Sequence, residues 1–248
     1  MLSIIIPTFN EEEYLPRLLE SIRRQTYRDY EIIVADNNSE DKTRAIAESF
    51  GARVSPGGNH PGKGRNRGAE VAKGDIYLFL DADVILEPEA WLAEKLAEFE
   101  RRQLDVASCT IKPLGGSALD KFSHDVYNVY LRATQFIMEH GGGFCLFARK
   151  AAHDRVHGFD ETITIAEDHD YVRRIAKTGK FRVLSGPGIA VSVRRFERDG
   201  RFNVFMKYLK VEAHNIVKGG VKTDLNYTWG HPKGLEKGLE KDNKKEGS

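Results

Sequence analysis

A short apolar run that ends on two aspartates constrains this chain more than any other feature. Residues 76–80 are all apolar, and Asp81 and Asp83 follow at once. A run of this length and composition is typical of a strand buried on both faces of a parallel sheet. Open α/β sheets bind ligands at the carboxyl ends of their strands, where both carboxylates would lie. The pattern therefore predicts an α/β fold with an acidic site beside this strand.

Two interpretations of the aspartate pair are open. Side chains two positions apart in an extended segment point the same way, so Asp81 and Asp83 can converge on one target. Two hard oxygen ligands suit Mg²⁺ or Mn²⁺ held jointly with substrate phosphates. The alternative is an aspartate that caps the next helix beside a solvated one, and the pair taken alone favours neither.

Strands and helices alternate in the first half of the chain. The expected strands are 2–6, 31–35, 53–55 and 76–80, and the expected helices are 11–25, 41–50, 66–72 and 88–99. Residues 56–64 are expected to form a Gly- and Pro-rich loop. This alternation predicts a mostly parallel central sheet flanked by helices, with right-handed crossovers.

The second half has a less regular pattern. The expected strands are 105–111, 144–147, 182–184 and 189–193, and the expected helices are 119–138, 167–177 and 202–216. We expect a single domain over 1–218 with two halves, 1–112 and 113–218, the second of which includes the last helix. The Lys- and Glu-rich remainder, 219–248, is expected to be a flexible tail.

Composition excludes several classes of protein. The 248 residues carry a net charge of +1, which argues against a dedicated nucleic-acid binder. Cys109 and Cys145 lie in apolar stretches and are expected to be buried free thiols. No secretory signal or membrane-spanning run is recognisable, so the expected location is the cytoplasm.

Polar residues follow the first two expected strands. Asp36 ends a buried strand and is expected to accept a hydrogen bond from a nucleobase, with Thr8 and Glu11 alongside. The main chain near these strand ends can also hold a base and ribose. Asn10 fits a turn residue equally well.

Two arginines lie in the segment 62–68, near a helix start. Its spacing matches neither of the common phosphate-binding glycine motifs. Arg65 or Arg67 can still reach a base carbonyl or a phosphate, and one of the two is expected to be an exposed surface residue.

Further along, Glu167 and Asp168 open a helix, where an aspartate can act as a general base toward an acceptor hydroxyl. The alternative is a helix start that favours acids through its dipole. Arg194 and Arg195 follow a strand and could neutralise a diphosphate leaving group, although arginines on a solvated turn fit as well.

Six segments occur in an order that resembles the family-2 glycosyltransferases with a GT-A fold. They are IIIPTFNEE, VADNNSEDKT, GRNRGAEVAKGDIYLFLDADV, GGGF, GFDE and AEDHDYVRR, and the resemblance covers about residues 1–200. It implies a nucleotide-sugar-dependent, inverting transferase that uses Mn²⁺ or Mg²⁺.

The resemblance also implies residue roles. Asp83 would bind the metal, and Asp81 would contact the ribose or a metal-bound water. Asp168 would be the general base, within the Glu167–Asp168 pair. The remaining implied ligands are the nucleobase site at Asp36, Pro7 and Thr8, the base or phosphate ligand Arg65, and the sugar-facing Gly142 and Gly143.

Some features depart from the family pattern. The segment ADNNSED replaces the commoner DDGS, which leaves the choice between UDP and GDP open, and no QxxRW segment exists, which argues against a processive synthase. The role of that missing segment would fall to Arg194 and Arg195.

The expected partners are a nucleotide-sugar donor and a glycan or lipid-linked acceptor, with no nucleic acid. The expected helix 202–216 is amphipathic and flanked by basic residues. It either packs on the core or contacts the inner face of a membrane. The alternative functions are a non-catalytic nucleotide-sugar-binding protein and a sugar-phosphate nucleotidyltransferase.

Overall fold

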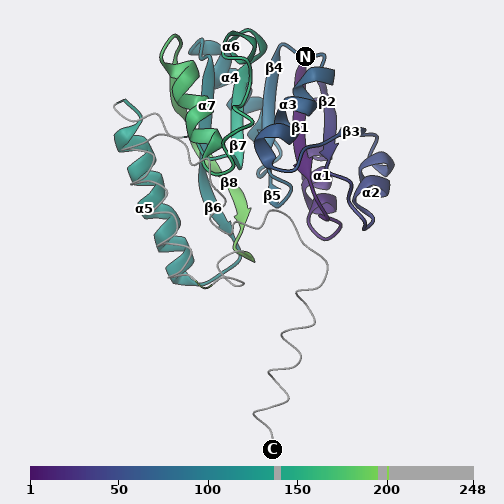
Figure 1. The fold of residues 1–248 in the computed structure, drawn as a ribbon. Helices are drawn as coiled ribbons and strands as arrows, with labels where there is room; N and C mark the ends of the chain where they lie inside the picture. The colour runs from purple at the N-terminus through teal and green to yellow at the C-terminus, as the bar shows by residue number, and fades with distance from the viewer. Residues whose placement is uncertain (137–140, 195–199, 201–248) are drawn as a thin grey trace, which may run out of the picture.

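The computed structural model describes residues 1–136, 141–194 and 200. Its centre is one eight-stranded sheet in the order β3-β2-β1-β4-β7-β6-β8-β5 (Figure 1). The strands are β1 (Leu2–Thr8), β2 (Tyr30–Asp36), β3 (Arg53–Pro56), β4 (Ile76–Leu80), β5 (Val84–Ile85), β6 (Val106–Leu114), β7 (Cys145–Arg149) and β8 (Phe181–Ser192). The helices are α1 (Leu15–Arg23), α2 (Thr43–Ser49), α3 (Pro61–Val71), α4 (Trp91–Arg101), α5 (Ala118–Thr134), α6 (Lys150–Arg155) and α7 (Glu167–Ala176).

The first four strands pair with one another in parallel. β1 pairs in parallel with both β2 and β4, and its last residue, Thr8, lies opposite Asp36. β7 runs antiparallel between β4 and β6, and β6 pairs in parallel with β8. The carboxyl ends of β1, β2 and β4 therefore meet at one edge, as the alternating pattern predicts.

Apolar side chains fill both faces of this sheet. One cluster packs α1, α2 and α4 against the sheet, and the other packs α3, α6 and α7 against its opposite face. Neighbouring residues of β1 show the alternation, because Ile4 and Ile6 join the first cluster while Ile5 joins the second. The predicted fold class, a mostly parallel sheet flanked by helices, is confirmed.

Helix α3 begins five residues earlier than predicted. The loop expected over 56–64 ends at His60, whose ring nitrogen accepts a hydrogen bond from the Lys63 amide, and Pro61 opens the helix. Gly64 and Gly68 face the sheet, and a Cβ at Gly68 would lie 2.3 Å from Cγ2 of Ile5. These two glycines let α3 lie close against β1.

Other boundaries also differ from the prediction. The two strands expected over 182–193 are one strand, β8, with a shift in register against β6 between Cys109 and Ile111. The short elements β5 and α6 were not expected from the pattern. Cys109 and Cys145 are buried free thiols, as predicted. The expected helix 202–216, the tail 219–248 and Arg195 lie outside the described residues.

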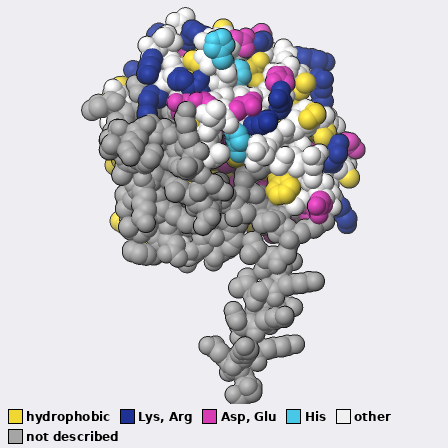
Figure 2. All heavy atoms as spheres, viewed as in Figure 1, with side chains coloured by type: hydrophobic (Ala, Val, Ile, Leu, Met, Phe, Trp, Pro, Cys, Tyr) yellow, Lys and Arg dark blue, Asp and Glu magenta, His cyan; other side chains and the backbone are white. Residues whose placement is uncertain are grey.

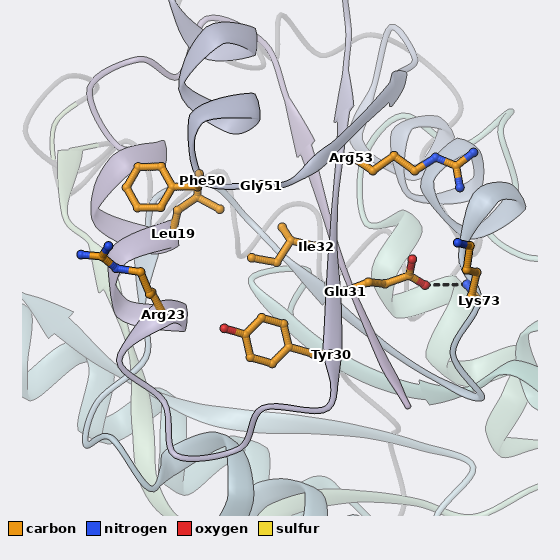
Figure 3. Close-up of a pocket in the computed structure, with 9 residues that line it drawn as sticks. All are labelled: Leu19, Arg23, Tyr30, Glu31, Ile32, Phe50, Gly51, Arg53 and Lys73. Carbon is orange, nitrogen blue, oxygen red and sulfur yellow. Dashed lines mark hydrogen bonds between the residues drawn. The ribbon is translucent and has the colours of Figure 1, made fainter.

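A surface hollow of about 400 Å³ lies at the amino-terminal end of β2. Figure 3 shows Leu19, Phe50 and Ile32 beside Tyr30, with Glu31 and Lys73 across the strand. No predicted site residue lines this hollow, because Asp36 is at the other end of β2. In the part of the chain that the structure describes, no helix has the length and apolar character needed to cross a membrane.

Candidate active site

The candidate site forms where β4 ends. Asp81 and Asp83 follow the buried residues of β4, and Val84 then begins β5, which pairs with β8. The Ser192 amide at the end of β8 donates a hydrogen bond of 3.1 Å to the Asp83 carbonyl. Because β5 pairs with the end of β8, Arg194 lies beside the acidic pair, although the two strands are far apart in the sequence.

Arg65 is a fully buried arginine that joins three segments. Its Nη1 donates to Oε1 of Glu167 at 2.7 Å, and its Nη2 donates to Oδ1 of Asp81 at 2.8 Å and to the Gly143 carbonyl at 3.0 Å. The guanidinium also lies 5.4 Å from the centre of the Phe159 ring. Arg67, in contrast, is an exposed partner of Glu70.

Asp168 is oriented by two backbone amides. Its Oδ2 accepts from the Gly143 amide at 2.5 Å, and its Oδ1 accepts from the His169 amide at 2.8 Å. The Gly143 residue thus contacts Asp168 through its N–H and Arg65 through its carbonyl. A Cβ at Gly143 would lie 2.6 Å from Arg65 Nη2, so a larger residue at this position would displace the Arg65 guanidinium.

Arg194 forms the other half of the site. Its Nε lies 2.8 Å from Oδ2 of Asp83, and its two terminal nitrogens donate to both oxygens of Glu11 at 2.9 and 3.0 Å. The guanidinium also lies 4.4 Å from the centre of the Tyr14 ring. Each aspartate of the pair therefore contacts a different arginine, Asp81 contacting Arg65 and Asp83 contacting Arg194.

Asp36 is held by neighbouring hydroxyl groups. Its carboxylate accepts from Thr8 Oγ1 at 3.0 Å, from Ser39 Oγ at 2.5 Å and from the Ser39 amide at 3.0 Å. The side-chain oxygen of Asn10 accepts from the Glu40 backbone amide, and the backbone amide of Asn10 donates to the Ser39 hydroxyl. Asn10 also has a φ of 53°, which favours asparagine in a turn. The loops after β1 and β2 are thus tied together.

Two buried glutamates have raised pKa values. Burial raises the pKa of Glu167 to about 7, the nearby Asp168 charge adds to the effect, and Arg65 opposes it. Burial likewise raises the pKa of Glu11 to about 7, against the hydrogen bonds and charge of Arg194. Each of these buried acids is paired with one guanidinium group, Glu167 with Arg65 and Glu11 with Arg194.

The residues suit a divalent cation shared with a ligand. Among the described residues, no three His, Cys, Asp or Glu side chains gather as a metal cage. Asp81 and Asp83 nevertheless already bind cationic groups, and Mg²⁺ is commonly held by one or two carboxylates together with substrate phosphates. The donor set fits that mode of binding.

The sequence patterns did not identify every contact at the site. Tyr14, Ser39, Thr43 and Phe159 contact predicted site residues, and Thr43 Oγ1 accepts from the Glu11 amide at 2.8 Å. Phe159 lies in the GFDE segment, so that motif could have indicated a residue in contact with the site. Pro7 packs against Gly64 of α3, Gly142 precedes Gly143 in the chain, and Arg195 is outside the described residues.

The amino-acid sequence of this chain matches a known protein family. The model of glycosyl transferase family 2 matches residues 3–156. Chondroitin synthase of Escherichia coli is 26% identical over 259 residues, 92% of this chain and 36% of that protein. The poly(ribitol-phosphate) beta-N-acetylglucosaminyltransferase TarS of Staphylococcus aureus is 30% identical over 123 residues, 46% of this chain and 21% of that protein. The chain belongs to glycosyl transferase family 2.

Solved structures agree on the fold. The structure of S. aureus TarS 1-349 with UDP-GlcNAc aligns with a TM-score of 0.64 and 23% identity, over 77% of this chain and 58% of that chain. The Pyrobaculum calidifontis mannosyltransferase PcManGT, with GDP-Man and Mn²⁺, aligns with a TM-score of 0.64 and 20% identity, over 84% and 64%. The chain spans about a third of the length of curated relatives such as chondroitin synthase.

Proposed function

We propose that this protein transfers a sugar from a nucleoside-diphosphate sugar to an acceptor hydroxyl, with inversion at the anomeric carbon. The observation that carries the proposal is the Arg65 network, in which one buried guanidinium contacts Asp81, Glu167 and the Gly143 carbonyl. It ties the acidic strand end to the start of α7, where Asp168 lies. Membership of glycosyl transferase family 2 supports the same reaction.

The donor is assigned to the edge formed by β1, β2 and β4, in residues 1–112. Asp36, Thr8 and the main chain near Pro7 would bind the nucleobase, with Asn10 shaping the turn. Asp81 would contact the ribose. The Asp36 side chain is 2% exposed and its carboxylate is held by Thr8 and Ser39, so a base N–H would bind there by replacing one of these hydroxyl partners.

Asp83, together with Asp81, would hold Mn²⁺ or Mg²⁺ against the donor diphosphate. The bound cation would neutralise charge on the leaving nucleoside diphosphate. Arg194 lies at the same carboxylate, and its guanidinium can contact the phosphates. Arg65 is assigned a positioning role in place of direct donor contact, because its side chain is buried and bonded to three protein groups.

Asp168 is assigned the general base. The acceptor oxygen would bond to the anomeric carbon as the bond to the diphosphate oxygen breaks, and the acceptor proton would pass to Asp168. Gly142 and Gly143 would let the sugar approach the backbone beside this carboxylate. The acceptor, a glycan or a lipid-linked glycan, would bind residues 113–218.

A thermal-stability screen tests this proposal without knowledge of the acceptor. We expect UDP or GDP, with its sugars, to raise the melting temperature in the presence of Mn²⁺ and to do so less with EDTA, because a ligand that binds the native state stabilises it. No shift with any nucleotide, with or without Mn²⁺, would contradict the donor site and favour a protein without this activity.

A further inference from the structure

The outward face of α5 carries an apolar stripe in contact with solvent. Leu119, Phe122, Val126 and Val129 are exposed to 60, 65, 52 and 69%, and Ala133 continues the series. The members are three and four positions apart in turn, the spacing of the a and d positions of a heptad. Such a stripe on a helix is typical of a surface that packs on another helix.

The opposite face of α5 is already attached to the domain. Asn128 bonds both the amide and the carbonyl of Ile111 on β6, at 2.8 and 2.7 Å, and Leu131 is buried in the second core cluster. A capping box formed by Ser117 and Asp120 holds the first turn. Figure 1 shows α5 at the outer margin of the molecule, beside β6. These contacts leave the stripe on the face of α5 that points away from the domain.

The exposed charges beside the stripe are self-complementary. Asp125 and Arg132 are both exposed and lie seven positions apart, which puts them on the same flank about 10 Å apart along the helix. If Leu119 and Val126 are a positions of a heptad, then Asp125 and Arg132 are both g positions. When two such helices pair antiparallel, g positions face each other, so Asp125 of one copy would meet Arg132 of the other.

We propose that α5 is the contact surface of a homodimer, in which two copies of α5 pair antiparallel about a two-fold axis. Val126 then packs on Val129 of the second copy near the axis, and the large Phe122 lies opposite the small Ala133. Leu119 lies at the end of the contact, because the Phe136 ring just beyond α5 is already covered on one side by the Arg182 guanidinium, 4.6 Å from its centre. The same patch serves both copies, as an isologous interface requires.

The charges favour a second copy over a membrane surface. A helix that lies on anionic lipid presents a strongly basic polar face. The exposed charged side chains of α5 are Lys121, Asp125 and Arg132, so acidic and basic groups are mixed along the stripe. The visible described surface of the domain is also mixed, as Figure 2 shows.

Sedimentation velocity of the full chain, from about 1 to about 100 µM, tests the proposal. We expect the mass to double with concentration. Val129→Lys should abolish the dimer without unfolding the protein, because this side chain is exposed. Lys121→Glu, a matched surface change away from the g positions, should leave the dimer unchanged. A monomer at every concentration, or an unchanged dimer in Val129→Lys, would overturn the proposal.

Charge reversal tests the antiparallel register. Asp125→Arg should weaken dimerisation at least tenfold because it places like charges together in two symmetric contacts, and Asp125→Arg/Arg132→Asp should restore it. A double variant no better than the single one would contradict the register. Flotation with anionic vesicles tests the membrane alternative. If the chain is monomeric, binds the vesicles, and loses this binding in Val129→Lys, then the stripe contacts lipid and the dimer proposal is wrong. All these readouts are independent of sugar transfer.

Discussion

The guanidinium of Arg194 lies 2.8 Å from the carboxylate of Asp83 and so occupies one side of the acid that we assign to the metal. Both side chains are largely buried, and Arg194 also spans Glu11. A divalent cation that binds Asp83 must share the carboxylate with Arg194 or displace it. The arginine thus neutralises the acid when no other cation does.

Removal of Arg194 is expected to raise metal affinity in the absence of nucleotide. In Arg194→Met, Asp83 is free of its cationic partner, and we expect Mn²⁺ to bind about tenfold more tightly, or about 1.4 kcal/mol. Electron paramagnetic resonance of free Mn²⁺ measures this directly. Arg67→Met, which removes an exposed arginine, is the control. Unchanged Mn²⁺ affinity in Arg194→Met would show that the two cations do not compete.

Arg65 is expected to contribute strongly to stability. Arg65→Met leaves Glu167 buried without its cationic partner, and we expect a loss of about 3 kcal/mol in the free energy of unfolding. Arg65→Met/Glu167→Gln should recover part of this loss, because the unpaired acid is then gone. Urea denaturation measures both variants against Arg67→Met. A loss below about 0.5 kcal/mol in Arg65→Met would contradict the buried network.

Asp168→Asn is expected to separate binding from transfer. The asparagine oxygen can still accept from one of the two backbone amides that orient Asp168, so the fold and donor binding should remain near those of the wild type. Transfer should fall by about 10²-fold or more, because the amide is a poor proton acceptor. Donor binding by calorimetry and turnover with a glycan acceptor give the two readouts. Turnover close to the wild-type rate would remove Asp168 from the base role.

Protonation of His153 is expected to lower the free energy of unfolding as the solution becomes more acidic. Burial lowers the pKa of His153 from 6.5 to about 4, and one ring nitrogen lies 2.9 Å from the Tyr171 hydroxyl. Between these two pH values the unfolded chain binds the extra proton, so this group makes stability fall as pH decreases from about 6.5 to 4, by at most about 3 kcal/mol.

The variant His153→Asn isolates this effect. Glu11 and Glu167 have raised pKa values and act in the opposite direction, weakening the fold as pH rises through about 7. The useful quantity is therefore the difference in unfolding free energy between wild type and His153→Asn at each pH. That difference should shrink as pH falls from 6.5 to 4, and a difference independent of pH would contradict the prediction.

The fold was predictable because its signal is local. The apolar run 76–80 and the acids after it follow directly from strand burial and sheet topology, and the structure places Asp81 and Asp83 at that strand end. The start of α3 at Pro61 was missed because the glycines of residues 62–68 lower helix propensity. Close packing of Gly64 and Gly68 on β1 outweighs that cost.

The partners of the site residues were not predictable. Arg65 and Glu167 are 102 positions apart, and Arg194 and Glu11 are 183 apart. Their meeting depends on the register of β8 with β5 and on the packing of α3, which no local pattern encodes. The prediction that one of Arg65 and Arg67 is a surface residue is confirmed, whereas the catalytic and binding roles stay predictions.

Titration calorimetry of UDP and GDP, with and without Mn²⁺, tests the central claim most directly. We predict that one nucleotide binds the wild-type protein tightly with Mn²⁺ and at least tenfold more weakly with EDTA. Asp83→Asn should bind weakly in both conditions while it remains folded. Equal nucleotide affinity with and without Mn²⁺, or metal-dependent binding that survives in Asp83→Asn, would contradict the assignment of Asp83 as the metal ligand of the donor site.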